Sequence, residues 1–91
     1  MENRSHYYYM LATKLMECDR KIDELKVRTE GAGDEARVAY KRRIVDLRER
    51  RDRAATLLEA AHEADDKGWK DTRKAADRLF TEVDDMLKLA A

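Results

Sequence analysis

The sequence predicts an all-α, elongated protein that forms one helical domain over residues 1–91. The chain has 44% charged residues and no proline, a composition typical of long helices and coiled coils. Its large apolar residues recur every three or four positions, as on one face of a helix, and this periodicity argues against disorder. Thirteen of the apolar residues are alanine. We therefore expect narrow contacts between helices and no core thick enough to enclose a pocket.

The first predicted element is a long helix over residues 8–67. Its first half carries an apolar stripe with the alternating spacing of four and three residues found in coiled coils, formed by Leu11, Leu15, Cys18, Ile22 and Leu25. The stripe passes through small residues over 29–36 and resumes at Tyr40. At the start of the chain, the run from Tyr7 to Tyr9 either closes the end of a bundle or projects from it.

Two glycines, Gly31 and Gly33, interrupt this helix, and the sequence leaves two structures open. Because the apolar stripe keeps its phase across them, the spacing favours a continuous helix kinked at the glycines, at a cost of about 1 kcal/mol per glycine relative to alanine. In the alternative, Gly31 ends one helix and Asp34 and Glu35 begin the next. That hairpin would give an antiparallel three-helix bundle.

The second predicted element is an amphipathic C-terminal helix over residues 69–89. Gly68 marks the break before it, and Asp66 offers a cap. Its apolar stripe includes the only tryptophan and the only phenylalanine of the chain, which need burial, and consists of Trp69, Arg73, Ala76, Phe80, Val83, Leu87 and Ala90. We expect this helix to fold back antiparallel along the second half of the long helix. Its acidic side would then lie near the basic stretch 41–53.

The stretch 41–53 raises the question of nucleic-acid binding, because it carries seven basic and three acidic residues. Contacts with phosphates need basic side chains whose charge is not already compensated. Here Asp46, Glu49 and Asp52 interleave with the arginines, and over the whole chain 20 basic residues balance 20 acidic ones. We therefore expect a solvated, internally paired face and no nucleic-acid partner.

The residue types of catalysis and metal binding do not converge on a recognisable site. His62 stands near acidic residues, but a zinc or iron site needs three or four convergent ligands, and the only other histidine is His6. Cys18 lies in the apolar stripe and is expected to be a small buried residue. We therefore expect no enzyme activity, no catalytic residues, no cofactor and no metal. The single cysteine and the absence of a membrane-spanning apolar run point to the cytoplasm.

Two segments carry a resemblance to a known group of proteins. The run "KIDELKVRTEGAGDEARVAYKRRIVDLRERRDRAATLLE", followed by "GWKDTRKAADRLFTEVDDMLK", resembles short bacterial coiled-coil proteins of unassigned activity. The likeness covers about residues 14–89 and does not extend to the tyrosine-rich start. It implies a soluble, helical bacterial protein, loosely associated with stress, with no catalytic residues to carry over.

A continuous helix would leave the stripe from Leu11 to Leu25 without a partner in its own chain, so it would need a second protein, most simply an identical copy. We therefore expect a non-catalytic protein that acts by self-association, as a homodimer or higher oligomer, or by binding another protein. The residues expected to carry this interaction are Leu11, Leu15, Cys18, Ile22, Leu25, Trp69, Phe80, Val83 and Leu87. The alternative is a stress-protective or membrane-surface-binding amphipathic protein. It is disfavoured because the polar face of 69–89 is acidic on balance, whereas helices that lie on lipid surfaces usually carry Lys and Arg.

Overall fold

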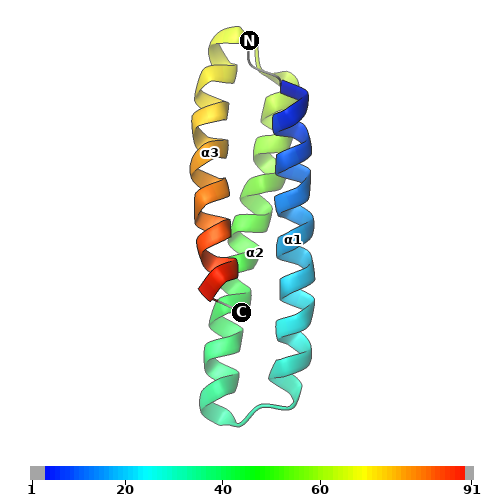
Figure 1. Cartoon of the computed structure of the whole chain (residues 1–91), viewed down its shortest axis with the longest axis vertical. Coiled ribbons are helices and arrows are strands. Elements are labelled where there is room, and N and C mark those ends of the chain that lie inside the picture. The colour runs from blue at the N-terminus through cyan, green and yellow to red at the C-terminus, as the bar shows by residue number, and fades with distance from the viewer. Residues whose placement is uncertain (1–3, 90–91) are drawn as a thin grey trace.

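The computed structural model describes residues 4–89, which form three helices: α1 (Arg4–Glu30), α2 (Asp34–Glu63) and α3 (Asp66–Leu89). They lie side by side in an elongated bundle of 50 × 18 × 16 Å, in which α2 runs antiparallel to both α1 and α3 (Figure 1). The predicted all-α, elongated fold with an antiparallel C-terminal helix is confirmed. None of these three helices contains an apolar stretch of the length that crossing a bilayer requires.

The continuous helix predicted over residues 8–67 is wrong, because the chain turns at Gly31–Gly33 and forms the alternative hairpin. Neither glycine adopts a positive φ. Gly33 has φ −71° and ψ 170°, an extended N-cap conformation, and Asp34 and Glu35 follow in the first turn, where acidic side chains interact favourably with the helix dipole. The hairpin covers the apolar stripe of α1 with α2. Burying each large side chain is worth about 1.5–3 kcal/mol. The several side chains of the stripe together therefore outweigh the net value of the few helical hydrogen bonds lost at the turn.

The second turn lies earlier than the sequence predicted. The structure ends α2 at Glu63 and begins α3 at Asp66, and the cap is Asp65 and not the predicted Asp66. Asp65 Oδ1 accepts a hydrogen bond from the Gly68 N–H at 2.7 Å, and its carbonyl accepts one from the Trp69 N–H at 2.8 Å. A Cβ atom at position 68 would come within 3.2 Å of Asp65 Oδ1. The glycine therefore belongs to the first turn of α3 and leaves room for the capping carboxylate.

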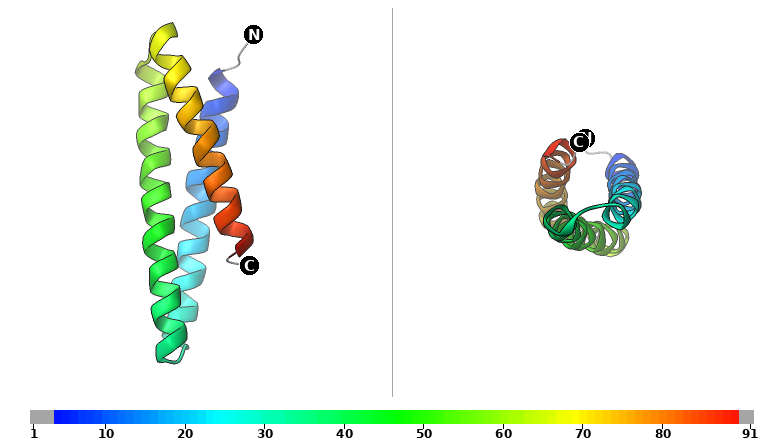
Figure 2. Two further views of the ribbon diagram at one scale, coloured as in Figure 1. Left: turned by 90° about the vertical axis from the view of Figure 1, so that its left-hand side faces the viewer. Right: turned by 90° about the horizontal axis from the view of Figure 1, so that it is seen from below.

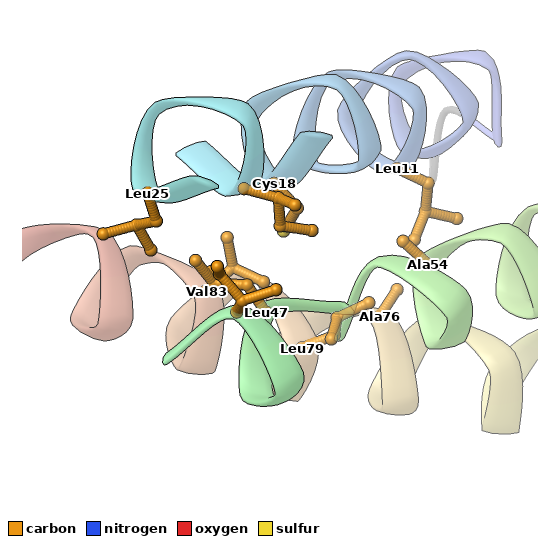
Figure 3. Packing of buried hydrophobic residues seen from close by; sticks show 10 residues of the cluster. Leu11, Cys18, Leu25, Leu47, Ala54, Ala76, Leu79 and Val83 are labelled. Atoms are coloured by element: carbon orange, nitrogen blue, oxygen red, sulfur yellow. The ribbon is translucent and has the colours of Figure 1, made fainter. Parts of the chain in front are cut away.

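The core is built from residues that repeat every seven positions on each helix (Figure 3). A seven-residue repeat places side chains on one side of a helix, so three such series can meet along a common axis. The alanines of α2 and α3 let the helices approach closely. The repeating buried residues are Leu11, Cys18 and Leu25 on α1, Leu47, Ala54 and Ala61 on α2, and Trp69, Ala76 and Val83 on α3.

Two polar contacts fix the position of α3 along α1. The Tyr7 hydroxyl donates a hydrogen bond to Asp77 Oδ1 at 2.9 Å, and Lys14 Nζ lies 2.6 Å from Asp84 Oδ1. Each pair joins residues 70 positions apart in the sequence. Because the two pairs are separated by seven residues on both helices, α1 and α3 run parallel and in register.

A third polar contact places α3 against α2. Glu82 lies between Arg50 and Arg53, with nitrogen–oxygen distances of 3.7 Å and 2.8 Å. Glu82, on the acidic side of α3, therefore reaches the basic stretch 41–53 as the sequence predicted, whereas Asp77 and Asp84 of the same side contact α1.

Substitution of Leu79 tests the packing of α3. Leu79 is fully buried, and truncation of a buried leucine to alanine typically costs about 2.7–5 kcal/mol. We expect Leu79→Ala to lower the free energy of unfolding, measured by urea denaturation, by an amount in this range. The matched control Val38→Ala truncates a side chain that is 60% exposed and should change stability by less than about 0.5 kcal/mol. Equal losses from the two variants would contradict this placement of α3.

Candidate functional site

The residues predicted to carry an interaction lie in the core of their own chain. Six of them are buried, and Leu15, Phe80 and Leu87 are partly buried and packed against the core. The hairpin thus provides the partner that a continuous helix would have left missing for the stripe from Leu11 to Leu25.

Aromatic side chains close the end of the bundle at which α2 turns into α3. The ring of Tyr7 packs edge-on against Trp69, with centroids 5.3 Å apart, and the ring of Tyr8 stacks on His62 at 4.4 Å. The Tyr8 hydroxyl donates a hydrogen bond to the carbonyl of Ala61 at 3.0 Å. Two tyrosines of the run therefore close the bundle end, whereas the side chain of Tyr9 is 69% exposed.

Arg4 completes this end cluster. Its guanidinium lies 5.0 Å from the centre of the Trp69 ring and donates a hydrogen bond to the carbonyl of Ala64 at 2.8 Å. It also lies 3.6 Å from Asp66. These contacts hold the second turn against the start of α1, so the cluster stabilises the fold.

Lys14 is a buried cation between α1 and α3. The residue is 7% exposed and contacts both Asp84 and, at 3.3 Å, Glu17. Burial by itself lowers the pKa of Lys14, but the hydrogen bond to Asp84 and the charges of both carboxylates outweigh burial, and the net pKa is raised. The ammonium group is therefore a charged structural contact and not a candidate base at neutral pH.

Cys18 is a buried free thiol. Burial, assisted by the charges of Glu17 and Asp19, raises the pKa of Cys18 to about 11. Since the thiolate is the nucleophilic form of cysteine, this thiol is not activated for catalysis.

The basic stretch divides into a part whose side chains form ion pairs and a part whose side chains are exposed. Arg50, Arg51 and Arg53 form ion pairs, including one across the helices from Arg51 to Asp19 at 3.0 Å. In the part of the chain that the structure describes, the other four basic side chains are exposed and no ion pair is found for them; they are Lys41, Arg42, Arg43 and Arg48. The predicted internally paired face is thus present only in the half of the stretch nearer α3.

Three of these four unpaired cations belong to a two-helix arm that extends beyond α3 (Figure 2), and Arg48 lies beside it. The contacts between residues 70 positions apart place Leu89, the end of α3, level with Asp19 of α1. We define the arm as residues 20–45, which comprise the last part of α1, the first turn of the bundle and the first part of α2. It contains eight basic and five acidic residues, a net charge of +3, whereas the whole chain is neutral.

An open groove lies between α1 and α2 where the arm joins the three-helix part. It is polar, and its lining mixes both charges with one aliphatic side chain: Asp19, Ile22, Asp23, Lys26, Arg48, Arg51 and Asp52. Among the described residues, no group of three or more His, Cys, Asp and Glu side chains is placed to hold a metal ion. The groove offers charged contacts to a partner but no nucleophile.

No match to this chain is found among protein-family models, curated proteins or solved structures. The resemblance to short bacterial coiled-coil proteins thus remains an expectation from the sequence. The sequence reasoning missed the arm because it depends on where α3 ends relative to the hairpin. The lengths of the predicted helices could have indicated it. The helix predicted over 69–89 is shorter than either half of a hairpin formed from residues 8–67, so it cannot cover the whole hairpin.

The buried thiol of Cys18 makes the stability of the bundle decrease at alkaline pH. Three groups, Cys18, Tyr7 and Lys14, have raised pKa values and hold their protons more tightly in the folded chain than in the unfolded one. Their stabilisation is therefore complete below about pH 9 and is lost as the pH rises through the folded pKa values, which is about 11 for Cys18.

We expect the free energy of unfolding of the native chain to fall between about pH 9 and 11, by at most about 1.4 kcal/mol per pH unit from Cys18. In Cys18→Ala the baseline stability will be lower because a buried side chain is truncated, but the decline over this range should be shallower. Urea denaturation at several pH values measures both slopes. Parallel curves for the two proteins would show that the thiol is not held in its protonated form.

Proposed function

We propose that this protein is a non-catalytic helical interaction module that acts by self-association or by binding another protein. The observation that carries this proposal is the arm. Over residues 20–45 two helices lack the third helix that covers the rest of the bundle, and four basic side chains on or beside this arm have no ion-pair partner among the described residues. Such a surface is suited to contact another macromolecule.

The chemistry of the remaining residues supports a role without catalysis. Cys18 is held as a buried thiol, and His62 is covered on one face by Tyr8. The interhelical groove is lined largely by charged side chains and is open to solvent. We also propose a reducing, cytoplasmic setting, in which a free cysteine persists. A bacterial origin and a link to stress depend on the resemblance alone.

The second hypothesis, binding to a membrane surface, finds less support. The apolar side of α3 is turned inwards, with Leu79 and Val83 fully buried and Trp69 only 6% exposed. Insertion of this face into a lipid surface would require α3 to leave the bundle. That opening would expose several core side chains, each at a cost of about 1.5–3 kcal/mol.

Sedimentation equilibrium tests the proposed self-association. Over loading concentrations from about 5 to 500 µM, we expect the mean mass to rise above the 10.7 kDa of one chain. A mass that stays at one chain over the whole range would contradict self-association. If cross-linking in a lysate of the cells that express the protein also yields no complex with another protein, the whole proposal is contradicted.

Tryptophan fluorescence separates this proposal from the membrane alternative. Because Trp69 is buried between Arg4 and Tyr7, we expect blue-shifted emission from the protein alone and no further shift with anionic vesicles. A large blue shift that occurs only when vesicles are added would favour the membrane hypothesis.

A further inference from the structure

The surface of the hairpin that receives α3 continues beyond the end of α3. On α1, Tyr7 and Lys14 contact the carboxylates of α3, and the next positions in this seven-residue series are Lys21 and Arg28. Lys21 pairs with Glu24 at 3.0 Å on its own helix, whereas Arg28 is exposed. The series whose polar side chains contact the carboxylates of α3 is therefore continued along the arm by two basic residues, where no third helix is present.

The same continuation is found on α2. Arg50 and Arg53 face Glu82 of α3. Seven residues before Arg50 on α2 is Arg43, and a further seven earlier is Ala36; both are exposed, whereas the positions seven and fourteen residues before Arg53 are Asp46 and Ala39. Small side chains of this kind let another helix approach the backbone closely, with the basic residue available for an ion pair at the flank.

Charge along the arm is not uniform. The tip, residues 28–37, contains three acidic and two basic residues, and among the described residues no ion pair is found for its exposed carboxylates Glu30, Asp34 and Glu35. The root, residues 20–27 and 38–45, contains six basic and two acidic residues. The tip therefore has a net charge of −1 and the root a net charge of +4.

We propose that the arm is a self-recognition surface, on which the arms of two copies pack side by side in opposite directions. This inference rests on the proposed function and specifies its partner as a second copy of the chain. An antiparallel pair places each acidic tip against the other copy's basic root, and a two-fold axis makes this contact twice. A parallel pair would place root against root and is opposed by like charges. Together the two hairpin arms complete a four-helix arrangement.

The size of the arm sets the strength of this contact. The α1 part of the arm, residues 20–30, contains eleven helical residues and spans about 16 Å, and the bundle is 18 Å wide. The contact area between two arms is therefore smaller than the interfaces of about 1,200–2,000 Å² that support stable complexes. The paired charges are exposed and are screened by salt. The dimer is therefore a weak one, whose dissociation constant lies in the micromolar range or above and rises with ionic strength.

A charge-reversal experiment tests this geometry by sedimentation equilibrium at low salt. The root variant is Arg42→Glu with Arg43→Glu, and the tip variant is Asp34→Arg with Glu35→Arg. Each alone should raise the dissociation constant about tenfold or more: the root variant leaves the root with no net charge and removes its attraction for the tip, and the tip variant gives the tip a net charge of +3, which the basic root repels. An equimolar mixture should associate better than either variant alone, since the acidic tip of the root variant meets the basic root of the tip variant, while the other contact joins a basic tip to a root without net charge.

The matched control is Lys74→Glu with Arg78→Glu, which makes the same charge change on the exposed side of α3, away from the arm. It should change the dissociation constant less than about twofold. Circular dichroism melts of all variants verify folding, which is expected to persist because no ion pair among the described residues joins the four substituted arm positions to the rest of the fold.

Each result decides a different part of the proposal. A chain that is monomeric at every concentration overturns both self-association and this inference. A native dimer that both arm variants leave intact, or a mixture that associates no better than its components, overturns the arm geometry alone. Sub-micromolar binding of duplex DNA to the native chain, lost in the root variant, would assign the basic root to nucleic acid and overturn the inference.

Discussion

The fold depends on the burial of one apolar stripe, that of α1. Leu11, Cys18 and Leu25 are fully buried on α1, and with few large apolar residues in the chain the loss of their contacts could not be compensated elsewhere. In a monomer with a continuous helix over residues 8–67, that stripe would face water. Closing the hairpin at Gly31–Gly33 buries it against α2, and α3 then completes the cover from its own seven-residue series. The heptad spacing on each helix serves the chain's own core, as it would serve the interface of an intermolecular coiled coil.

Polar contacts add specificity to this thin core. Alanine at several core positions allows close packing but says little about how far one helix is shifted along another. The buried Lys14–Asp84 pair and the Tyr7–Asp77 hydrogen bond define that shift, and Glu82 adds a contact with α2. Only this register satisfies both contacts: a shift of α3 by one heptad brings Asp77 opposite Lys14 but Lys70 opposite Tyr7 in one direction, and in the other removes the carboxylate opposite the buried Lys14, at a large energetic cost. The length of α3 in this register determines where it ends, and so creates the arm.

The sequence was sufficient for the helices and for the residues that pack, because both follow from periodicity. It was insufficient at Gly31–Gly33, since the a/d phase of the stripe is the same whether the chain continues or turns back. The decision there is made by burial of residues far apart in the sequence. The cap at Asp65 was missed by one residue because Asp65 and Asp66 have the same local chemistry. The arm could not be identified from local patterns, because it depends on the register between α1 and α3. The basic stretch 41–53 is only partly paired for the same reason: α3 reaches Arg50 and Arg53 but ends before Arg42.

The hairpin is the central claim, and a single distance tests it directly. Spin labels attached to Tyr9→Cys and Glu59→Cys in a Cys18→Ala background, diluted with unlabelled protein, report the separation of two exposed positions 50 residues apart. In the bundle these positions lie on neighbouring antiparallel helices, since Tyr8 contacts Ala61, and the molecule is only 16–18 Å thick. Pulsed electron–electron double resonance should therefore give a distance between the two labels below about 35 Å, including the length of the label linkers. A continuous helix would separate the labels by about 75 Å, and a distance near that value would contradict the account.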